Sequence, residues 1–111
     1  MELSKANRKV AREIIESGLQ HEFKNGLVAA AAIIKQWEDK AGDNREYYHL
    51  LYSTIRNFDK HIARRSDAMR ASDYLFVIAA QLRDGVISEK DLASLSEEMR
   101  QQIQLIATLN S

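Results

Sequence analysis

The sequence predicts an all-α protein, and three observations carry that prediction. Apolar residues recur every three to five positions along most of the chain, which is the spacing of one face of a helix. The 111 residues include no proline, which costs about 3 kcal/mol in a helix interior. No segment shows the alternation of apolar and polar residues typical of a strand. We therefore expect a single domain over residues 1–111, a small bundle of four to five helices with a long first helix.

The first helix has the clearest apolar stripe. Ser4 suits its N-cap, and segment 41–43, which contains a glycine, suits its end. Gly18 and Gly26 lie inside the pattern, so we expect a kink near Gly18 or two nearly collinear pieces. The stripe consists of Leu3, Ala6, Val10, Ile14, Leu19, Phe23, Leu27, Ala30, Ile34 and Trp37.

Residues 27–34 of this helix are apolar on every side. A helix on the surface of a small monomer cannot bury its whole circumference, so part of this segment is expected to meet another chain. The alternative is a central helix wrapped by its own neighbours. We expect a homodimer, held by Leu27, Val28, Ile34 and Trp37.

Three further helices are predicted. The second spans 44–65, the third spans 72–84, and the last follows a capping box formed by Ser88 and Asp91. Gly85 suits the left-handed position that ends the third helix. The inner stripe of the second helix is Tyr48, Leu51, Tyr52, Ile55, Phe58 and Ile62. That of the last helix is Leu92, Leu95, Met99, Ile103 and Ile106.

Composition limits the function classes. Sixteen basic residues balance sixteen acidic ones, which argues against a nucleic-acid partner, and there is no cysteine for disulfides, thiolate catalysis or zinc. The longest apolar run has eight residues, against about 20 for a membrane-spanning helix. The N-terminus lacks the pattern of a signal peptide. We expect a cytoplasmic protein with no membrane insertion.

The motifs that resemble catalytic or metal sites are incomplete. Glu46 and His49 have the Glu-x-x-His spacing of di-iron bundles, but no second copy exists. Segment 84–91 resembles half of a calcium loop, yet Ala80 and Leu82 occupy the positions of the first ligands. No phosphate-binding loop or nucleophile elbow is present. We expect no enzyme activity, no metal and no cofactor, and His49 on a surface or interface.

A local basic cluster and several aromatic residues remain as candidate contact residues. Asp59, Asp67 and Asp73 could neutralise the cluster, which leaves a solvated face or a docking site for an acidic protein surface as alternatives. Phe76 could lie in the core or at an interface, where aromatic residues are favoured anchors. The cluster is Lys60, His61, Arg64, Arg65 and Arg70.

The third predicted helix carries a family resemblance. Residues 76–82 read Phe-Val-Ile-Ala-Ala-Gln-Leu, and residues 83–87 continue with Arg-Asp-Gly-Val-Ile. This span resembles the fluorescence recovery protein family, and a looser similarity extends from about residue 14 to 109. The resemblance implies an all-helical homodimer that binds the photoactivated orange carotenoid protein. It implies that the dimer speeds the return of that protein to its inactive form, ending phycobilisome quenching in non-photochemical photoprotection.

The resemblance also implies where partners bind. The family's patch on the second helix, Trp-x-x-His-Asp with a later Arg, aligns with His49, Tyr52, Ser53 and Asp59, none of which retains the family residue. The family's phenylalanine is retained as Phe76. We expect a partner surface made of His49, Tyr52, Ser53, Asp59, Lys60, Arg64, Arg65 and Phe76. Such a protein would reach a thylakoid through its protein partner. A dimeric helical interaction module with another partner, and more distantly an enzyme or metal protein, are the alternatives.

Overall fold

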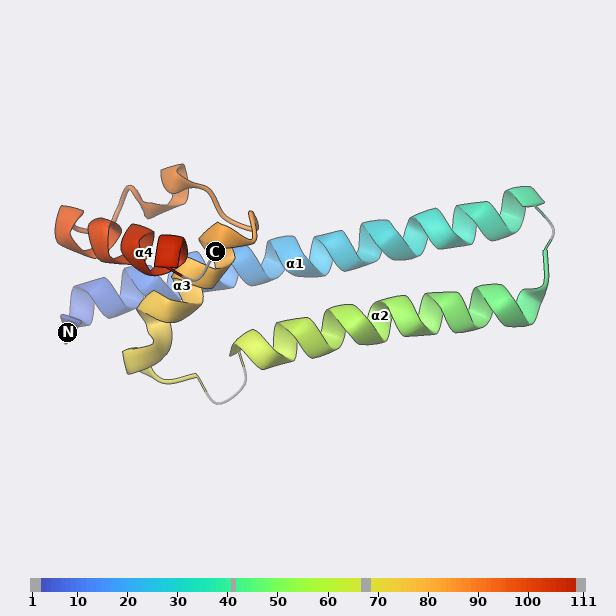
Figure 1. The fold of residues 1–111 in the computed structure, drawn as a ribbon, viewed down its shortest axis with the longest axis horizontal. Helices are drawn as coiled ribbons and strands as arrows, with labels where there is room; N and C mark the ends of the chain where they lie inside the picture. The colour runs from blue at the N-terminus through green and yellow to red at the C-terminus, as the bar shows by residue number, and fades with distance from the viewer. Residues whose placement is uncertain (1–2, 41, 67–68, 110–111) are drawn as a thin grey trace.

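The computed structural model describes residues 3–40, 42–66 and 69–109, and all regular elements within them are helical. Helix α1 (Lys5–Lys40) and helix α2 (Asn44–Ser66) form a long antiparallel hairpin, while helices α3 (Tyr74–Arg83) and α4 (Glu97–Leu109) pack at one end (Figure 1). The radius of gyration is 17.3 Å, against about 13 Å for a compact domain of 100 residues. The molecule is therefore a compact head with a projecting two-helix arm. The expected all-α fold with a long first helix is confirmed.

The first helix is continuous from Lys5 to Lys40, so the alternative of two collinear pieces that meet near Gly18 is wrong. A Cβ at position 18 would lie 2.4 Å from Nε2 of Gln81, so any larger residue here would have to displace that side chain. Gln81 is fully buried on α3 and donates a hydrogen bond to the carbonyl of Ile15 (3.1 Å). Gly18 thus lets α3 pack directly against α1.

The head holds the main core, which lies between the first half of α1 and helices α3 and α4. Its side chains come from apolar stripes that the sequence placed on the inner faces of these helices. The buried cluster comprises Ala11, Ile14, Ile15, Leu75, Val77, Ile78, Ala79, Ile87, Leu92, Leu95, Met99 and Ile103.

Two predicted helix boundaries are wrong. The third helix is preceded by a separate 3₁₀ turn η1 (Ala71–Asp73), so α3 itself begins at Tyr74. The capping box of Ser88 and Asp91 is present, with the Ser88 amide 2.7 Å from the Asp91 carboxylate, but it caps the 3₁₀ turn η2 (Glu89–Leu92). The last α-helix starts later, where the Ser96 hydroxyl accepts a hydrogen bond from the Met99 amide. Gly85 has φ = 75°, as expected after α3.

The arm is packed far more loosely than the head. Ile62 is the only residue of α2 classed as buried among those described, while Leu51 and Phe58 are half-buried against α1. Near the tip, the Trp37 indole donates a hydrogen bond to the side chain of Asn44 (2.7 Å). None of the helices in the described residues is long and apolar enough to cross a membrane.

Candidate protein-interaction surface

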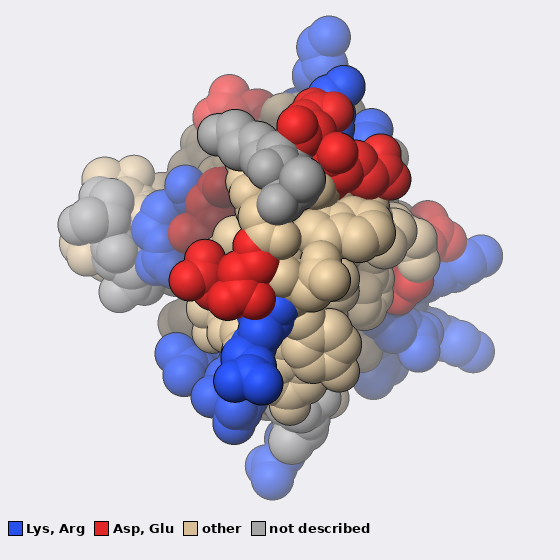
Figure 2. Space-filling model, turned by 90° about the vertical axis from the view of Figure 1, so that its right-hand side faces the viewer, with Lys and Arg blue, Asp and Glu red and all other residues tan. Residues whose placement is uncertain are grey.

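One side of the arm presents a continuous apolar surface, here called the arm face. Its residues follow helical spacing on both helices and are between 42% and 70% exposed. They belong to the stripes predicted to point inward, but a two-helix arm covers only part of each stripe. Seen from the tip, uncharged surface lies open between separate acidic and basic groups (Figure 2). The arm face consists of Phe23, Leu27, Ile34, Trp37, Tyr48, Tyr52 and Ile55.

Two hollows lie along the arm face. The tip hollow, of about 360 Å³, is lined by Ile33, Ile34, Trp37, Asn44, Tyr47, Tyr48 and Leu51. The base hollow, of about 270 Å³ and nearer the head, is lined by Glu22, Phe23, Gly26, Leu27, Ile55, Phe58, Asp59 and Ile62. Both draw on α1 and α2, so they open on the seam between the two helices. Their apolar walls suit side chains of another protein.

The four residues predicted at the dimer interface are all exposed, but they do not all share one side. Leu27, Ile34 and Trp37 lie on the arm face. Val28 is separated from Leu27 by about 100° around α1, because an α-helix has 3.6 residues per turn. It therefore lies toward the back of α1, so a dimer formed through the arm face would not include it, contrary to the prediction from the sequence.

At the base of the arm, a buried ion-pair network joins three helices. Arg65 of α2 binds both Glu22 of α1 and Asp84 at the end of α3, and the side chains of Arg65 and Glu22 are only 6% and 4% exposed. His61 lies 3.0 Å from the Arg65 guanidinium and 3.8 Å from Asp84. Arg65 was predicted to contact a partner, but here it is occupied within the fold. Its position near other basic residues in the sequence gave no sign of this.

The outward side of α2, opposite α1, carries a basic stripe. His49, Ser53, Arg56, Lys60 and Arg64 succeed one another at helical spacing and are all exposed. Among the described residues, no ion pair is present at the three cations Arg56, Lys60 and Arg64. The acids expected to neutralise the cluster do not do so: Asp59 lies beside the base hollow, Asp73 accepts a hydrogen bond from the Arg70 amide, and Asp67 lies outside the described residues.

The predicted partner-binding residues therefore divide between separate surfaces. His49, Ser53, Lys60 and Arg64 belong to the basic stripe, to which the structure adds Arg56, a residue that sequence reasoning missed. Its signal was the seven-residue step from His49, which returns to the same side of a helix. Tyr52 and Asp59 lie on the arm side with the hollows. Phe76 is on the head and 60% exposed, so it does not lie in the core of the chain, and its place at an interface stays a prediction.

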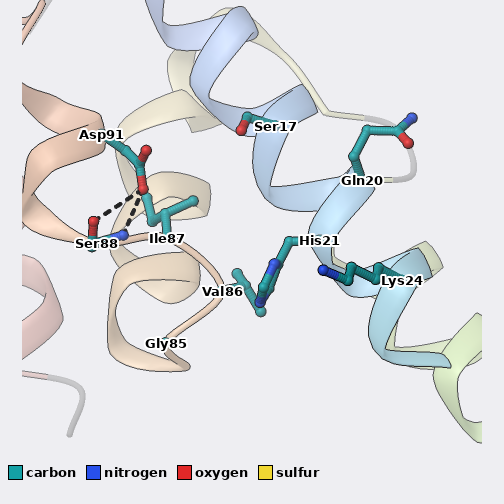
Figure 3. A pocket seen from close by; sticks show the side chains of 9 residues that line it. All are labelled: Ser17, Gln20, His21, Lys24, Gly85, Val86, Ile87, Ser88 and Asp91. Atoms are coloured by element: carbon teal, nitrogen blue, oxygen red, sulfur yellow. Dashed lines mark hydrogen bonds between the residues drawn. The ribbon is translucent and has the colours of Figure 1, made fainter. Parts of the chain in front are cut away.

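A polar cleft lies on the other side of α1, beside the loop after α3 (Figure 3). His21 reaches toward Val86, Lys24 points into the opening, and Gln20 points away. Ser17, His21 and Asp91 are residue types of a hydrolase triad, but Asp91 is engaged by Ser88 in the capping box. No hydrogen bonds connect the three in the described structure, so the relay that a triad requires is not formed.

The described residues contain no group of three or more His, Asp or Glu side chains placed to hold a metal ion. His49, half of the Glu-x-x-His pair, is exposed on α2, where its ring contacts that of Tyr48 edge to face. The arm face, with its exposed apolar side chains, and the basic stripe, with its exposed cations, are thus the two candidate surfaces for binding another protein. Comparisons with models of protein families, with curated proteins and with solved structures find no match to this chain.

Proposed function

We propose that this chain is a homodimeric, non-enzymatic protein that acts by binding another protein. The observation that carries the proposal is the arm face, a row of large apolar and aromatic side chains that the fold leaves uncovered. Exposed apolar surface of this kind is costly in water and is typical of interaction sites. A second copy of the arm would cover it and convert two helical hairpins into a four-helix layer, the usual stable arrangement for such stripes.

The second surface of the proposal is the basic stripe of α2. Arg56, Lys60 and Arg64 point outward, and none of them forms an ion pair with a described residue. An acidic partner surface would therefore make favourable charge contacts with them and would associate faster. Phe76 on the head would add an aromatic anchor. In this proposal the arm face holds the dimer together, while the stripe and Phe76 contact the regulated partner.

The partner implied by the sequence resemblance is the photoactivated orange carotenoid protein, and we propose it as the first partner to test. The dimer would bind the relaxed form, or the transition state leading to it, more tightly than the active form. The first would shift the population toward the relaxed form and the second would speed relaxation, in both cases without covalent chemistry. The second candidate is a dimeric interaction module with a different acidic partner. It is favoured by the residues at the family's patch, where His49, Tyr52, Ser53 and Asp59 replace the family's own.

Dimerisation can be tested with two adjacent substitutions of the same type. Leu27→Glu places a charge on the arm face, whereas Val28→Glu places it toward the back of α1, and both residues are well exposed. By light-scattering chromatography we expect a dimer for the wild type and Val28→Glu, and a monomer for Leu27→Glu. The reverse pattern would move the interface to the back of α1. A monomeric wild type would contradict the dimer altogether.

Partner regulation can be tested by timing the colour recovery of photoactivated orange carotenoid protein. We expect acceleration by the wild type that weakens with added salt and with Lys60→Glu/Arg64→Glu, because the contact depends on charge. Lys9→Glu/Arg12→Glu, two exposed changes on α1 within the head that alter the net charge by the same amount, is the matched control. Failure of a large excess to speed recovery would reject this partner and leave the second candidate.

A further inference from the structure

One residue that lines the base hollow carries a buried acceptor that has no donor in the described structure. Glu22 lines the hollow and is 3% exposed. Its Oε1 accepts a hydrogen bond from Arg65, whereas its Oε2 has no partner in the described structure. A buried acceptor left in this way is costly, because it has lost water and gained nothing in exchange. A group with an apolar body and an O–H or N–H donor at its end would suit the hollow and, on reaching Oε2, would satisfy this acceptor.

Tyrosine is such a group, and two tyrosines lie exposed on the same arm face. Tyr48 and Tyr52 are 69% and 58% exposed, although a phenol ring has an apolar body that favours burial. Tyr48 lines the tip hollow of its own chain, beside Trp37. Trp37 lies ten residues beyond Leu27 on α1, so the two hollows are about 15 Å apart at 1.5 Å per residue. Tyr48 therefore cannot reach the base hollow of its own chain.

A second copy can supply the tyrosine if the two arms lie face to face with their heads at opposite ends. A two-fold axis midway along the arm then exchanges the hollows, so that the tip of each arm lies over the base of the other. Tyr52, one helical turn nearer the head than Tyr48, falls close to the axis. This orientation also separates the two heads, which are the bulkiest parts of the molecule (Figure 1).

We infer that Tyr48 of each copy inserts into the base hollow of the other and donates its phenol hydrogen to Oε2 of Glu22. The inference rests on the proposed homodimer and goes beyond it, because it fixes the orientation of the two chains and names the contact. The contact occurs twice in the dimer by symmetry. Each base hollow, at about 270 Å³, has room for a phenol ring.

The first test removes a single hydroxyl. Tyr48→Phe should weaken the dimer, measured by sedimentation equilibrium, at least about tenfold, since a hydrogen bond to a charged group is lost at each of two sites. Tyr52→Phe makes the same chemical change on the same face and should stay within about twofold of the wild type. Equal dissociation constants for Tyr48→Phe and the wild type would overturn the inference while leaving the dimer. A monomeric wild type would overturn both.

The second test reads the orientation directly. The chain has no cysteine, so Tyr48→Cys combined with Asp59→Cys introduces the only pair, and Asp59 lines the base hollow. Eleven residues separate the two positions on one helix, about 16 Å, so a disulfide can form only between chains. Oxidation above the dissociation constant should give a covalent dimer. The pair Tyr48→Cys/Arg64→Cys, with its second cysteine on the outward stripe, should not, and equal crosslinking of both pairs would contradict the arrangement.

Discussion

Arg65 provides the sharpest test of how the arm is fixed to the head. Its guanidinium lies between Glu22 and Asp84, and it is the described polar link through which α2 reaches both α1 and the end of α3. Arg65→Met keeps most of the side-chain volume but removes the charge. The Glu22 carboxylate, whose side chain is 4% exposed, would then stay buried without a cation. Asp84 is 31% exposed and can turn to water, so most of the loss arises at Glu22.

The expected loss is large on the scale of a small domain. Breaking a buried ion pair by removing one partner costs about 3–5 kcal/mol, against a total stability of about 5–15 kcal/mol. We expect Arg65→Met to lower the free energy of unfolding by about 3 kcal/mol, measured by urea denaturation monitored by circular dichroism. Each protein is compared at one concentration, since dimerisation adds to apparent stability.

Two companion variants make this prediction refutable. Arg64→Met changes an exposed neighbour and should alter the free energy of unfolding by no more than about 0.5 kcal/mol. The double variant Arg65→Met/Glu22→Met removes both buried charges and should recover most of the loss, because an apolar pair often replaces a buried ion pair without cost. An Arg65→Met protein as stable as Arg64→Met, or a double variant no better than the single, would refute the reasoning.

Three further substitutions test local features of the fold by urea denaturation. Gly18→Ala should destabilise by about 1–3 kcal/mol, because its Cβ would lie 2.4 Å from Nε2 of Gln81, a buried group that the change would displace. Gly26→Ala is the control: its Cβ would come no closer than 3.4 Å to a neighbouring side chain, so the change should be neutral or stabilising by up to about 1 kcal/mol. Gly85→Ala should cost about 1–2 kcal/mol through its positive φ alone, since no described atom beyond the adjacent residues lies within 4 Å of a Cβ placed there. A smaller loss for Gly85→Asn would identify backbone strain as the cause. Ser88→Ala should cost about 1 kcal/mol by removing the hydroxyl's part of the capping box, and a loss no larger than that of an exposed surface change would show that the hydroxyl contributes little.

Sequence reasoning predicted the features that local spacing determines. Apolar periodicity located the main helices, and Gly85 ended α3 with the expected left-handed backbone. The start of α4 was missed because the Ser88 capping box is genuine but closes a single 3₁₀ turn, and a box carries no information about the length of the helix that it begins. The continuity of α1 was missed because the reason for Gly18 lies on α3, at Gln81, far along the chain.

The site residues were predicted unevenly for the same reason. Arg64 and Arg65 are adjacent in the sequence and were assigned one role, yet one points outward and the other is buried between two acids. Glu22 gave little sign of its importance, because an acid on an apolar stripe acquires its meaning only from the cation that reaches it. That cation is 43 residues away. Contacts between distant segments decide which charges are available to a partner, and local spacing cannot report them.

The apolar stripes of the two arm helices are wider than the contact between those helices. In the head, the stripe of α1 is matched by two helices and is buried. In the arm, the same stripe meets only α2, whose own stripe is equally wide, so Leu27 and Tyr48 stay exposed although they fit the inward-facing pattern. A sequence under no constraint at those positions would place polar residues there, as it does on the basic stripe of the same helix. The width of the stripe is therefore better explained by a third and fourth helix than by the hairpin alone, and the second copy of the arm in the proposed dimer would supply both.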